Sequence, residues 1–290
     1  MKETLKNITI GLLIIFIFIK RPVLVEAIIL AINIWINTIF PALFPFLIIS
    51  DLIISSNIVT FITLRFHLLF KTLFKVSGYG AYVFILSLIS GTPSNAKFVR
   101  DLLEIKVIEN IEAVKILSMS MLYNPLLILA ITSFLKTADQ AFIIITNIFI
   151  NLIIGLCNRC VPCNISLVKS APTIKFNLVH SISKTINTLL LILGAIVLFT
   201  ALISLLPLTH PLTNGALEII SGLRIIDNVI DYNLQLIFTG ILLSFGGLSI
   251  QTQMKSILKD YNLDYSLFYK SRIIHLALFL IIIYLIIILI

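Results

Sequence analysis

Residues 84–104 read FILSLISGTPSNAKFVRDLLE, and this stretch decides the fold. An apolar run up to Ile89 is interrupted by six residues of poor helix propensity, 90–95, before a second apolar run continues to Leu103. Neither arm reaches the roughly 20 residues that a helix needs to cross a bilayer. Irregular backbone is tolerated at membrane depth only where it is buried in protein or lines a watery cavity, so we predict a re-entrant hairpin over 79–103. A short cytoplasmic loop between two membrane helices is the alternative.

The composition of the chain is that of a membrane protein. Its 290 residues are 59% hydrophobic and only 12% charged, with a mean hydropathy of +1.13. Soluble domains carry about 25% charged residues, so we predict an all-α polytopic membrane protein. The net charge of +8 fits basic cytoplasmic loops and does not indicate nucleic-acid binding. We expect the lipid bilayer and a small-molecule substrate as partners, no nucleic acid and no cofactor, and we leave a homo-oligomer open.

The N-terminal part is expected to contain several spans. Residues 7–19 are followed by a Lys-Arg-Pro sequence and not by a small-residue cleavage site, so they predict a retained span. The apolar stretch 23–56 is too long for one straight helix, and two prolines four residues apart predict its division into 23–40 and 41–56. Asp51 lies in the second piece and should face protein or water, unless the span ends beside it at the interface.

The middle of the chain predicts one interfacial helix and two spans. Residues 60–75 mix basic and apolar side chains, which is typical of a helix in the headgroup plane. A full span is predicted at 113–135, where Asn124-Pro125 places a polar amide and a proline near the midplane. A purely structural kink is the alternative reading of that dipeptide. Residues 139–156 predict the next span.

The loop 157–184 is basic and contains no acid, so it is the strongest cytoplasmic signal in the chain. It also contains Cys157, Cys160 and Cys163. Three thiols at this spacing could bind a metal, but a zinc site uses four ligands and no fourth is evident nearby. We therefore expect no metal site.

The C-terminal part predicts spans at 185–206 and 273–290. Between them, residues 212–235 mix polar and apolar side chains and include Glu218. Acids in such segments are costly and often functional, so Asp51 and Glu218 are candidates for ion or proton coupling.

A second broken run suggests an internal repeat. Residues 236–258 break at Gly246-Gly247 and predict a second hairpin, with Gly91 and Gly246 lying 155 positions apart. Each half then has the order span, interfacial helix, re-entrant hairpin, span. An odd number of spans separates the hairpins, so the two repeats are predicted to be inverted. The predicted domains are N-terminal spans in 1–40, a first repeat in 41–135, a linking span with the basic loop in 136–184, and a second repeat in 185–290.

Four motifs occur in order along the chain: FPALFPF at 40–46, SGTP at 90–93 running into Ala96-Lys97, NPL at 124–126, and FGGLS at 245–249. Together they resemble the YlbJ/SpoVV family of sporulation integral membrane proteins, which carry a nucleoside-recognition gate domain. The matches extend over nearly the whole chain. Thr92 stands where the family usually has tyrosine, and Asn95 where it usually has a small residue.

The resemblance implies a fold similar to the core of concentrative nucleoside transporters and a role in moving dipicolinate across the membrane around the forespore. It implies the bacterial cell membrane as the location, or the forespore-surrounding membrane where the organism sporulates. We predict a secondary transporter of a small polar, anionic solute that works by alternating access between two hairpins. An enzyme is not expected, because the four histidines lie singly in the sequence. A nucleoside transporter, or a membrane scaffold or sporulation factor without flux, is the alternative.

The substrate site is predicted at the hairpin tips, where the N-termini of half-helices suit an anionic group. Lys97 is expected to pair with a substrate carboxylate, unless it snorkels to the cytoplasmic interface. Gly91, Pro93, Gly246 and Gly247 are expected to shape the two tips. The full set of predicted substrate-binding residues is Ser94, Asn95, Lys97, Asn124, Ser249, Gln251 and Gln253.

Overall fold

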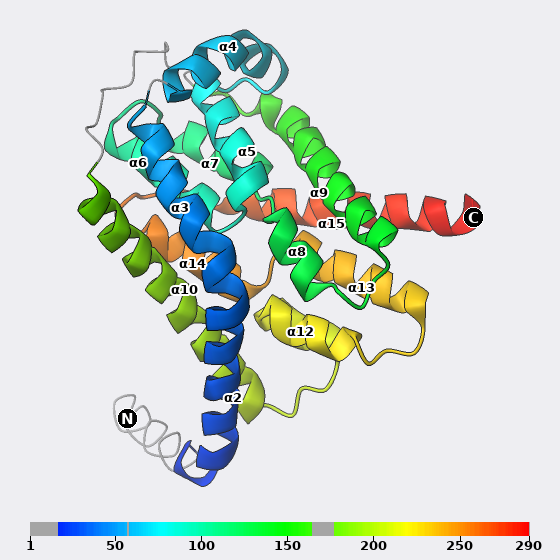
Figure 1. The fold of residues 1–290 in the computed structure, drawn as a ribbon. Coiled ribbons are helices and arrows are strands. Elements are labelled where there is room, and N and C mark those ends of the chain that lie inside the picture. Colours follow the sequence, from blue (N-terminus) through cyan, green and yellow to red (C-terminus); the bar gives the residue numbers. More distant parts are fainter. Residues whose placement is uncertain (1–16, 57, 164–176, 290) are drawn as a thin grey trace, which may run out of the picture.

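The computed structural model describes residues 17–56, 58–163 and 177–289, which form an all-α polytopic membrane protein (Figure 1). Five helices of the described part are long and apolar enough to cross a bilayer, and a sixth span results if the bent pair α4 (Ile58–Leu73) and α5 (Gly78–Ser90) is counted as one. The predicted span 7–19 lies mostly outside the described residues. The five candidate spans are Arg21–Ile53, Thr137–Cys160, Leu178–Leu205, Tyr232–Ile257 and Ser266–Ile286.

The first candidate span is continuous, so the predicted division at residue 40 is wrong. Helix α2 (Arg21–Ile34) leads into one π-helical turn, η1 (Trp35–Ile39), and then into α3 (Phe40–Ile54). The wider turn lets the Phe40 N–H bond to the Trp35 carbonyl just before Pro41, which starts α3 at a position where no N–H is needed. The Trp35 indole N–H also donates to the Leu189 carbonyl of α10 (Leu178–Leu205) at 3.1 Å, which fixes this long helix against one that is distant in the sequence.

The predicted break at residues 90–95 is present. Helix α4 (Ile58–Leu73) turns by 103° into α5 (Gly78–Ser90), and after a three-residue break α6 (Ser94–Glu104) packs back against α5. The break contains Gly91 at φ +72° and a cis Thr92–Pro93 bond. The two arms therefore form a helical hairpin inside the protein. Its insertion into a membrane, like the interfacial position of α4, stays a prediction.

The predicted span 113–135 is two half-helices. Helix α7 (Asn110–Met119) is followed by the non-helical segment 120–124, and α8 (Pro125–Ile131) starts after it. The residue before a proline avoids the helical region, and Asn124 indeed lies at φ −57°, ψ 124°. Its side-chain oxygen accepts from the N–H groups of Leu126 and Leu127, so Asn124 restarts a helix and does not merely kink one.

Helix α9 (Thr137–Cys157), a short 3-10 turn η2 (Asn158–Cys160) and helix α10 (Leu178–Leu205) follow. Helices α9 and α10 contain the predicted spans 139–156 and 185–206, apart from the last residue of the latter. Helix α10 packs along α2 and α3, and their contact contains the apolar cluster around Ala31, Leu47 and Leu189.

A second hairpin is present, but earlier in the sequence than predicted. The short helices α11 (Pro211–Leu217) and α12 (Ile219–Ile226) pack tightly against one another around Glu218. A Cβ added to Gly222 would lie 2.4 Å from the Gly215 Cα, so these two glycines form the contact between the arms. The arms are short and mixed in polarity, and they lack the apolar length that would identify a membrane hairpin in the sequence.

The predicted hairpin 236–258 is instead a broken span. Helix α13 (Tyr232–Phe245) and helix α14 (Leu248–Ile257) form one 26-residue candidate span, and they follow one another across the molecule without folding back (Figure 1). Gly246 and Gly247, at φ +86° and +57°, interrupt the helix but do not reverse its direction. The last helix is α15 (Ser266–Leu289), and it packs along α13.

The order of these elements occurs twice along the chain, in a different register from the predicted repeat. The order span, hairpin, broken span, span is followed first by α3, α5/α6, α7/α8 and α9, and then by α10, α11/α12, α13/α14 and α15. The hairpin break at Gly91 lies 127 positions before Glu218, and the start of α9 at Thr137 lies 129 positions before the start of α15 at Ser266. These similar offsets replace the predicted 155, which paired a hairpin with a broken span. The inverted orientation and the domain boundaries stay predictions.

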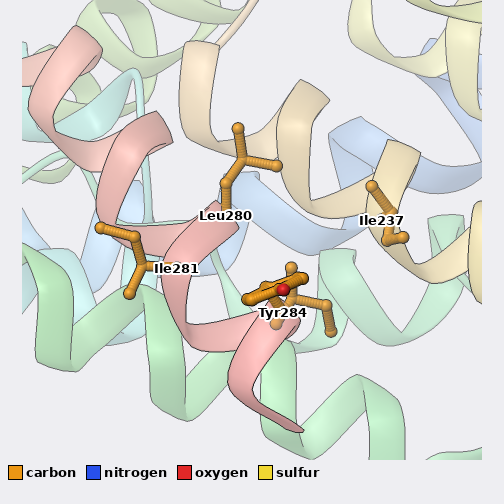
Figure 2. Close-up of a pocket in the computed structure, with 5 residues that line it drawn as sticks. Ile237, Leu280, Ile281 and Tyr284 are labelled. Atoms are coloured by element: carbon orange, nitrogen blue, oxygen red, sulfur yellow. The ribbon is translucent and has the colours of Figure 1, made fainter. Parts of the chain in front are cut away.

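A groove between α13 and α15 opens on the outer surface (Figure 2). It is lined by Ile237, Leu280, Ile281, Ile283 and Tyr284, and the exposed fractions of Ile281 and Tyr284 are 55% and 64%. Such a wholly apolar lining suits lipid chains and offers a polar solute almost no hydrogen bonds.

The glycine contact in the second hairpin gives a test of the fold. We expect Gly222→Val to lower the thermal unfolding midpoint in detergent, because the new side chain meets the Gly215 backbone and forces the helices apart, at a cost of about 1–3 kcal/mol. Gly194→Val on α10 is the matched control, since no atom lies within 4 Å of a Cβ there. Equal midpoints for the two variants would contradict the packing of α11 on α12.

Candidate functional site

A cavity lies where the chain breaks of the two halves meet. Thr92 and Pro93 come from the first hairpin tip, Tyr123 from the α7/α8 break, and Glu218 from the second hairpin tip. Gln253 of α14 also reaches it. The cavity is narrow, with a volume of about 40 Å³ for the centres of water-sized molecules, and its remaining walls are apolar. These walls are formed by Ile39, Leu43, Leu127, Ile131, Ile192, Ile196, Ile219, Ile220 and Ile250.

The first hairpin tip is held directly against the α7/α8 break. The Thr92 N–H donates to the Leu122 carbonyl at 2.6 Å. A Cβ on Gly91 would lie 2.2 Å from the Asn124 backbone nitrogen, so only glycine permits this approach. Two interrupted helices thus satisfy part of each other's backbone hydrogen bonding, which is required where water is excluded.

Glu218 is the only charged side chain among the described residues that line the cavity. Its exposed fraction is 3%, and its carboxylate accepts a hydrogen bond from the Ser221 N–H at 2.8 Å as the N-cap of α12. None of the ion pairs in the described part of the chain includes it. Acids at such depth are often functional, so Glu218 stays the candidate for ion or proton coupling that the sequence predicts.

Lys97 and Asp51 were predicted separately, as a substrate partner and a coupling residue, and the structure brings them together. The Lys97 ammonium pairs with Asp51 and lies 3.4 Å from the Ser50 hydroxyl, while Ser181 of α10 donates to the other Asp51 oxygen at 2.6 Å. The Lys97 side chain is fully buried, and neither residue lines the cavity. The pair therefore joins α6, α3 and α10, and a substrate carboxylate could bind Lys97 only by competing with Asp51.

The other polar residues predicted in the first half hold the breaks in place. The Asn95 amide donates to the Ser120 carbonyl at 3.2 Å, and its oxygen accepts from the Ala96 N–H. The Asn124 amide donates to the Ala42 carbonyl at 3.3 Å in addition to capping α8. Ser94 is buried, and its hydroxyl finds no partner in the described structure.

In the second half, the predicted residues are divided between the break and the cavity. The Gln251 amide donates to the Phe245 carbonyl at 3.1 Å and bridges the interruption at Gly246 and Gly247. The Gln253 amide donates to the Ser249 hydroxyl at 3.1 Å. Of the seven predicted substrate-binding residues, only Gln253 lines the cavity, together with the predicted tip residue Pro93 and the coupling candidate Glu218.

The sequence analysis missed several buried polar residues. Arg272 and His275 lie inside the protein on α15, and neither is among the predicted site residues. Lys115 of α7 is also buried and donates to the carbonyls of Lys75 and Val161 and to the Cys163 sulfur at 3.6 Å. Burial raises the pKa of the Cys163 thiol. Within the described ranges, no three His, Cys, Asp or Glu side chains are placed to hold a metal ion.

Comparisons with known proteins support one relationship. The chain is similar to "Sporulation integral membrane protein YlbJ" of Bacillus subtilis (strain 168), with 25% identity over 295 aligned residues that cover 83% of this chain and 72% of the relative. No family model matches the chain. No solved structure matches it. The similarity confirms the resemblance to the YlbJ family and the assignment as a multi-pass integral membrane protein.

The buried pair gives a second test. We expect Asp51→Asn to destabilise the protein by about 3–5 kcal/mol, because it removes the direct ion-pair partner of the buried Lys97 ammonium. The double variant Asp51→Leu with Lys97→Met should recover much of this loss, since no charge is then buried alone. Thermal unfolding in detergent measures both, with Glu26→Gln on an exposed face of α2 as the control. A double variant as unstable as Asp51→Asn would contradict this account.

Proposed function

We propose that this relative of YlbJ is a secondary transporter and that its solute binds in the cavity between the two hairpin tips. The observation that carries the proposal is the convergence of two hairpin tips and two broken spans on one cavity. Secondary transporters place their sites where discontinuous helices meet between repeats, because interrupted backbone can be accommodated and used for binding there. The cavity is narrow, with about 40 Å³ for the centres of water-sized molecules, so the two hairpin tips would have to move apart to admit the solute. Rocking of one half of the fold against the other would widen the cavity and expose it alternately to each side.

The lining of the cavity favours a small solute with apolar faces and a few polar groups. Isoleucine and leucine side chains supply most of the wall, while Thr92, Glu218 and Gln253 offer hydrogen bonds. A flat aromatic ring such as that of dipicolinate, the solute implied by the family resemblance, suits such walls. A nucleobase would suit them too, which keeps a nucleoside as the second candidate solute.

The charges around the cavity put a condition on an anionic solute. Lys97 is engaged by Asp51, and the charged group that faces the cavity is the Glu218 carboxylate. Two like charges about 4 Å apart repel by about 4 kcal/mol at an effective dielectric constant of 20. A carboxylate solute would therefore bind together with a proton on Glu218, and transport of the anion would be coupled to protons.

Two other functions are less well supported. An enzyme would need a nucleophile with a base, or a metal, and among the described cavity residues Glu218 stands without a second acid or a histidine. A scaffold or sporulation factor without flux would not require two hairpin tips and two broken spans to line one cavity. We accordingly propose that the chain is not an enzyme, and we expect a small molecule and the bilayer as its partners.

Uptake into proteoliposomes tests the function directly. The purified protein would be offered dipicolinate, a nucleoside and a simple dicarboxylate, each in labelled form, with protein-free liposomes as the background. Saturable uptake of one of them, competed by the unlabelled solute, is expected. Binding of these solutes without flux in either direction would favour the scaffold.

Glu218 gives the test of proton coupling. For a carboxylate solute, we expect uptake by the unaltered protein to fall as the pH rises, because deprotonated Glu218 repels the solute. Glu218→Gln keeps the shape of the protonated acid, so uptake should be retained at low pH and should lose most of its pH dependence. Glu26→Gln, an exposed change on α2, is the control. If both variants keep the same pH profile as the unaltered protein, Glu218 does not carry the proton.

A further inference from the structure

Arg272 is a guanidinium buried among three candidate or broken spans without an acidic partner. It lies on α15 with an exposed fraction of 2%, facing α7 and α9. The ion pairs of the described residues are Lys97–Asp51, Arg100–Asp101 and Lys184–Asp101, and none of them includes Arg272. A charge held inside a membrane protein without an opposite charge is costly, so its position requires a physical reason.

The guanidinium is directed at the end of a half-helix. One terminal nitrogen of Arg272 donates to the Ser118 carbonyl at 2.7 Å, in the last turn of α7 before the break. The same nitrogen donates to the Asn151 side-chain oxygen at 3.0 Å, and the Asn151 amide donates to the Met121 carbonyl at 3.1 Å inside the break. The last carbonyls of a helix lack partners within the helix and carry its negative dipole end.

Four carbonyls at this break accept hydrogen bonds from four different elements. Arg272 of α15 binds Ser118, and Asn95 of α6 binds Ser120. Asn151 of α9 binds Met121, and the Thr92 N–H of the first hairpin tip binds Leu122. Of these four donors, only Arg272 carries a positive charge. Its guanidinium carbon lies 5.6 Å from the centre of the Phe268 ring, which is a cation–π contact.

We propose that Arg272 is a tethered cation: it occupies a cation site formed by the carbonyl end of α7, the position at which discontinuous helices in other transporters can bind Na⁺ or a proton. Because the charge is part of the chain, the α7/α8 break holds its shape without a dissolved metal cation. The inference concerns the stability of the break and does not depend on which solute, if any, crosses the membrane.

Neighbouring side chains are arranged to support this role. The His275 ring accepts at Nε2 from the amides of Asn147 and Asn151, at 3.3 and 3.4 Å. With both amides turned toward His275, the Asn151 oxygen is left to accept from Arg272. Nε and the second terminal nitrogen of Arg272 have no hydrogen-bond partner in the described structure. The alternative is that they bind an anion such as chloride, and the experiment distinguishes this from the tethered cation.

The experiment measures thermal unfolding of the full chain in detergent, with choline as the base cation. For the unaltered protein, we expect the midpoint to be the same in choline, Na⁺, K⁺ and Li⁺. Arg272→Ala should lower it by roughly 5–10 °C. Free guanidinium at low concentration should restore part of this loss in a saturable manner, because the shortened side chain leaves room for it beside the Ser118 carbonyl. Arg272→Met is the matched control: it removes the same charge but fills the space, so it should be destabilised and not restored.

A second comparison keeps the inference testable if Arg272→Ala fails to fold. Arg272→Lys retains a positive charge and should be more stable than Arg272→Met. Equal stability of these two variants, or no restoration of Arg272→Ala by guanidinium, would overturn the proposal. A midpoint of the unaltered protein that rises saturably with chloride but not with gluconate would overturn it as well, because Arg272 would then hold an anion.

Discussion

The fold depends on a constraint that acts on backbone atoms and not on side chains. Inside a membrane protein, the N–H and C=O groups freed by a broken helix have no bulk water to bind, so every break must find partners within the chain. The hydrogen bond from the Thr92 N–H to the Leu122 carbonyl meets this requirement by joining two breaks that lie 30 positions apart in the sequence. Gly91 is needed there for the close approach, and Asn95, Asn124 and Asn151 supply further donors around it. The polar residues of this region therefore act mainly as hydrogen-bond donors to backbone carbonyls. The cavity is the space left between the helix breaks that these hydrogen bonds fix in place.

Local signals in the sequence predicted some of these breaks and misplaced others. Gly91 and Pro93 disfavour a helix on their own, so the first hairpin could be predicted with its boundaries nearly correct. The interruption at Asn124-Pro125 was predicted at the right dipeptide. Hydropathy does not distinguish a kinked helix from two half-helices, however, because both are equally apolar. The break at Gly246-Gly247 was wrongly predicted to be a hairpin tip for a related reason. Two glycines at positive φ interrupt a helix, but they do not determine whether the chain turns back. The second hairpin was missed because α11 and α12 are too short to be recognised by apolar length.

The candidate site could be predicted only residue by residue. Glu218, Pro93 and Gln253 were identified as single polar or conformationally special residues in apolar surroundings, and all three line the cavity. The pairing of Lys97 with Asp51 joins residues 46 positions apart on different helices, and no periodicity in the sequence brings them together. Arg272 was overlooked because a basic residue shortly before a span usually lies at the interface, whereas here α15 begins six residues earlier and carries the charge into the protein. In each case the surroundings of the residue depend on tertiary contacts, and hydropathy along the sequence does not report these contacts.

The chain has one tryptophan, and its position has a practical consequence. The Trp35 indole lies in the π-helical turn of the first span and donates to the Leu189 carbonyl of α10. The nearby residues Ile39 and Ile192 line the cavity from these same two helices. The tryptophan fluorescence of the protein therefore comes from a single, known contact between two membrane helices, and its wavelength depends on the polarity and hydrogen bonding at that contact. Changes at this contact, beside the cavity, can therefore be followed by the fluorescence of Trp35 without an attached dye.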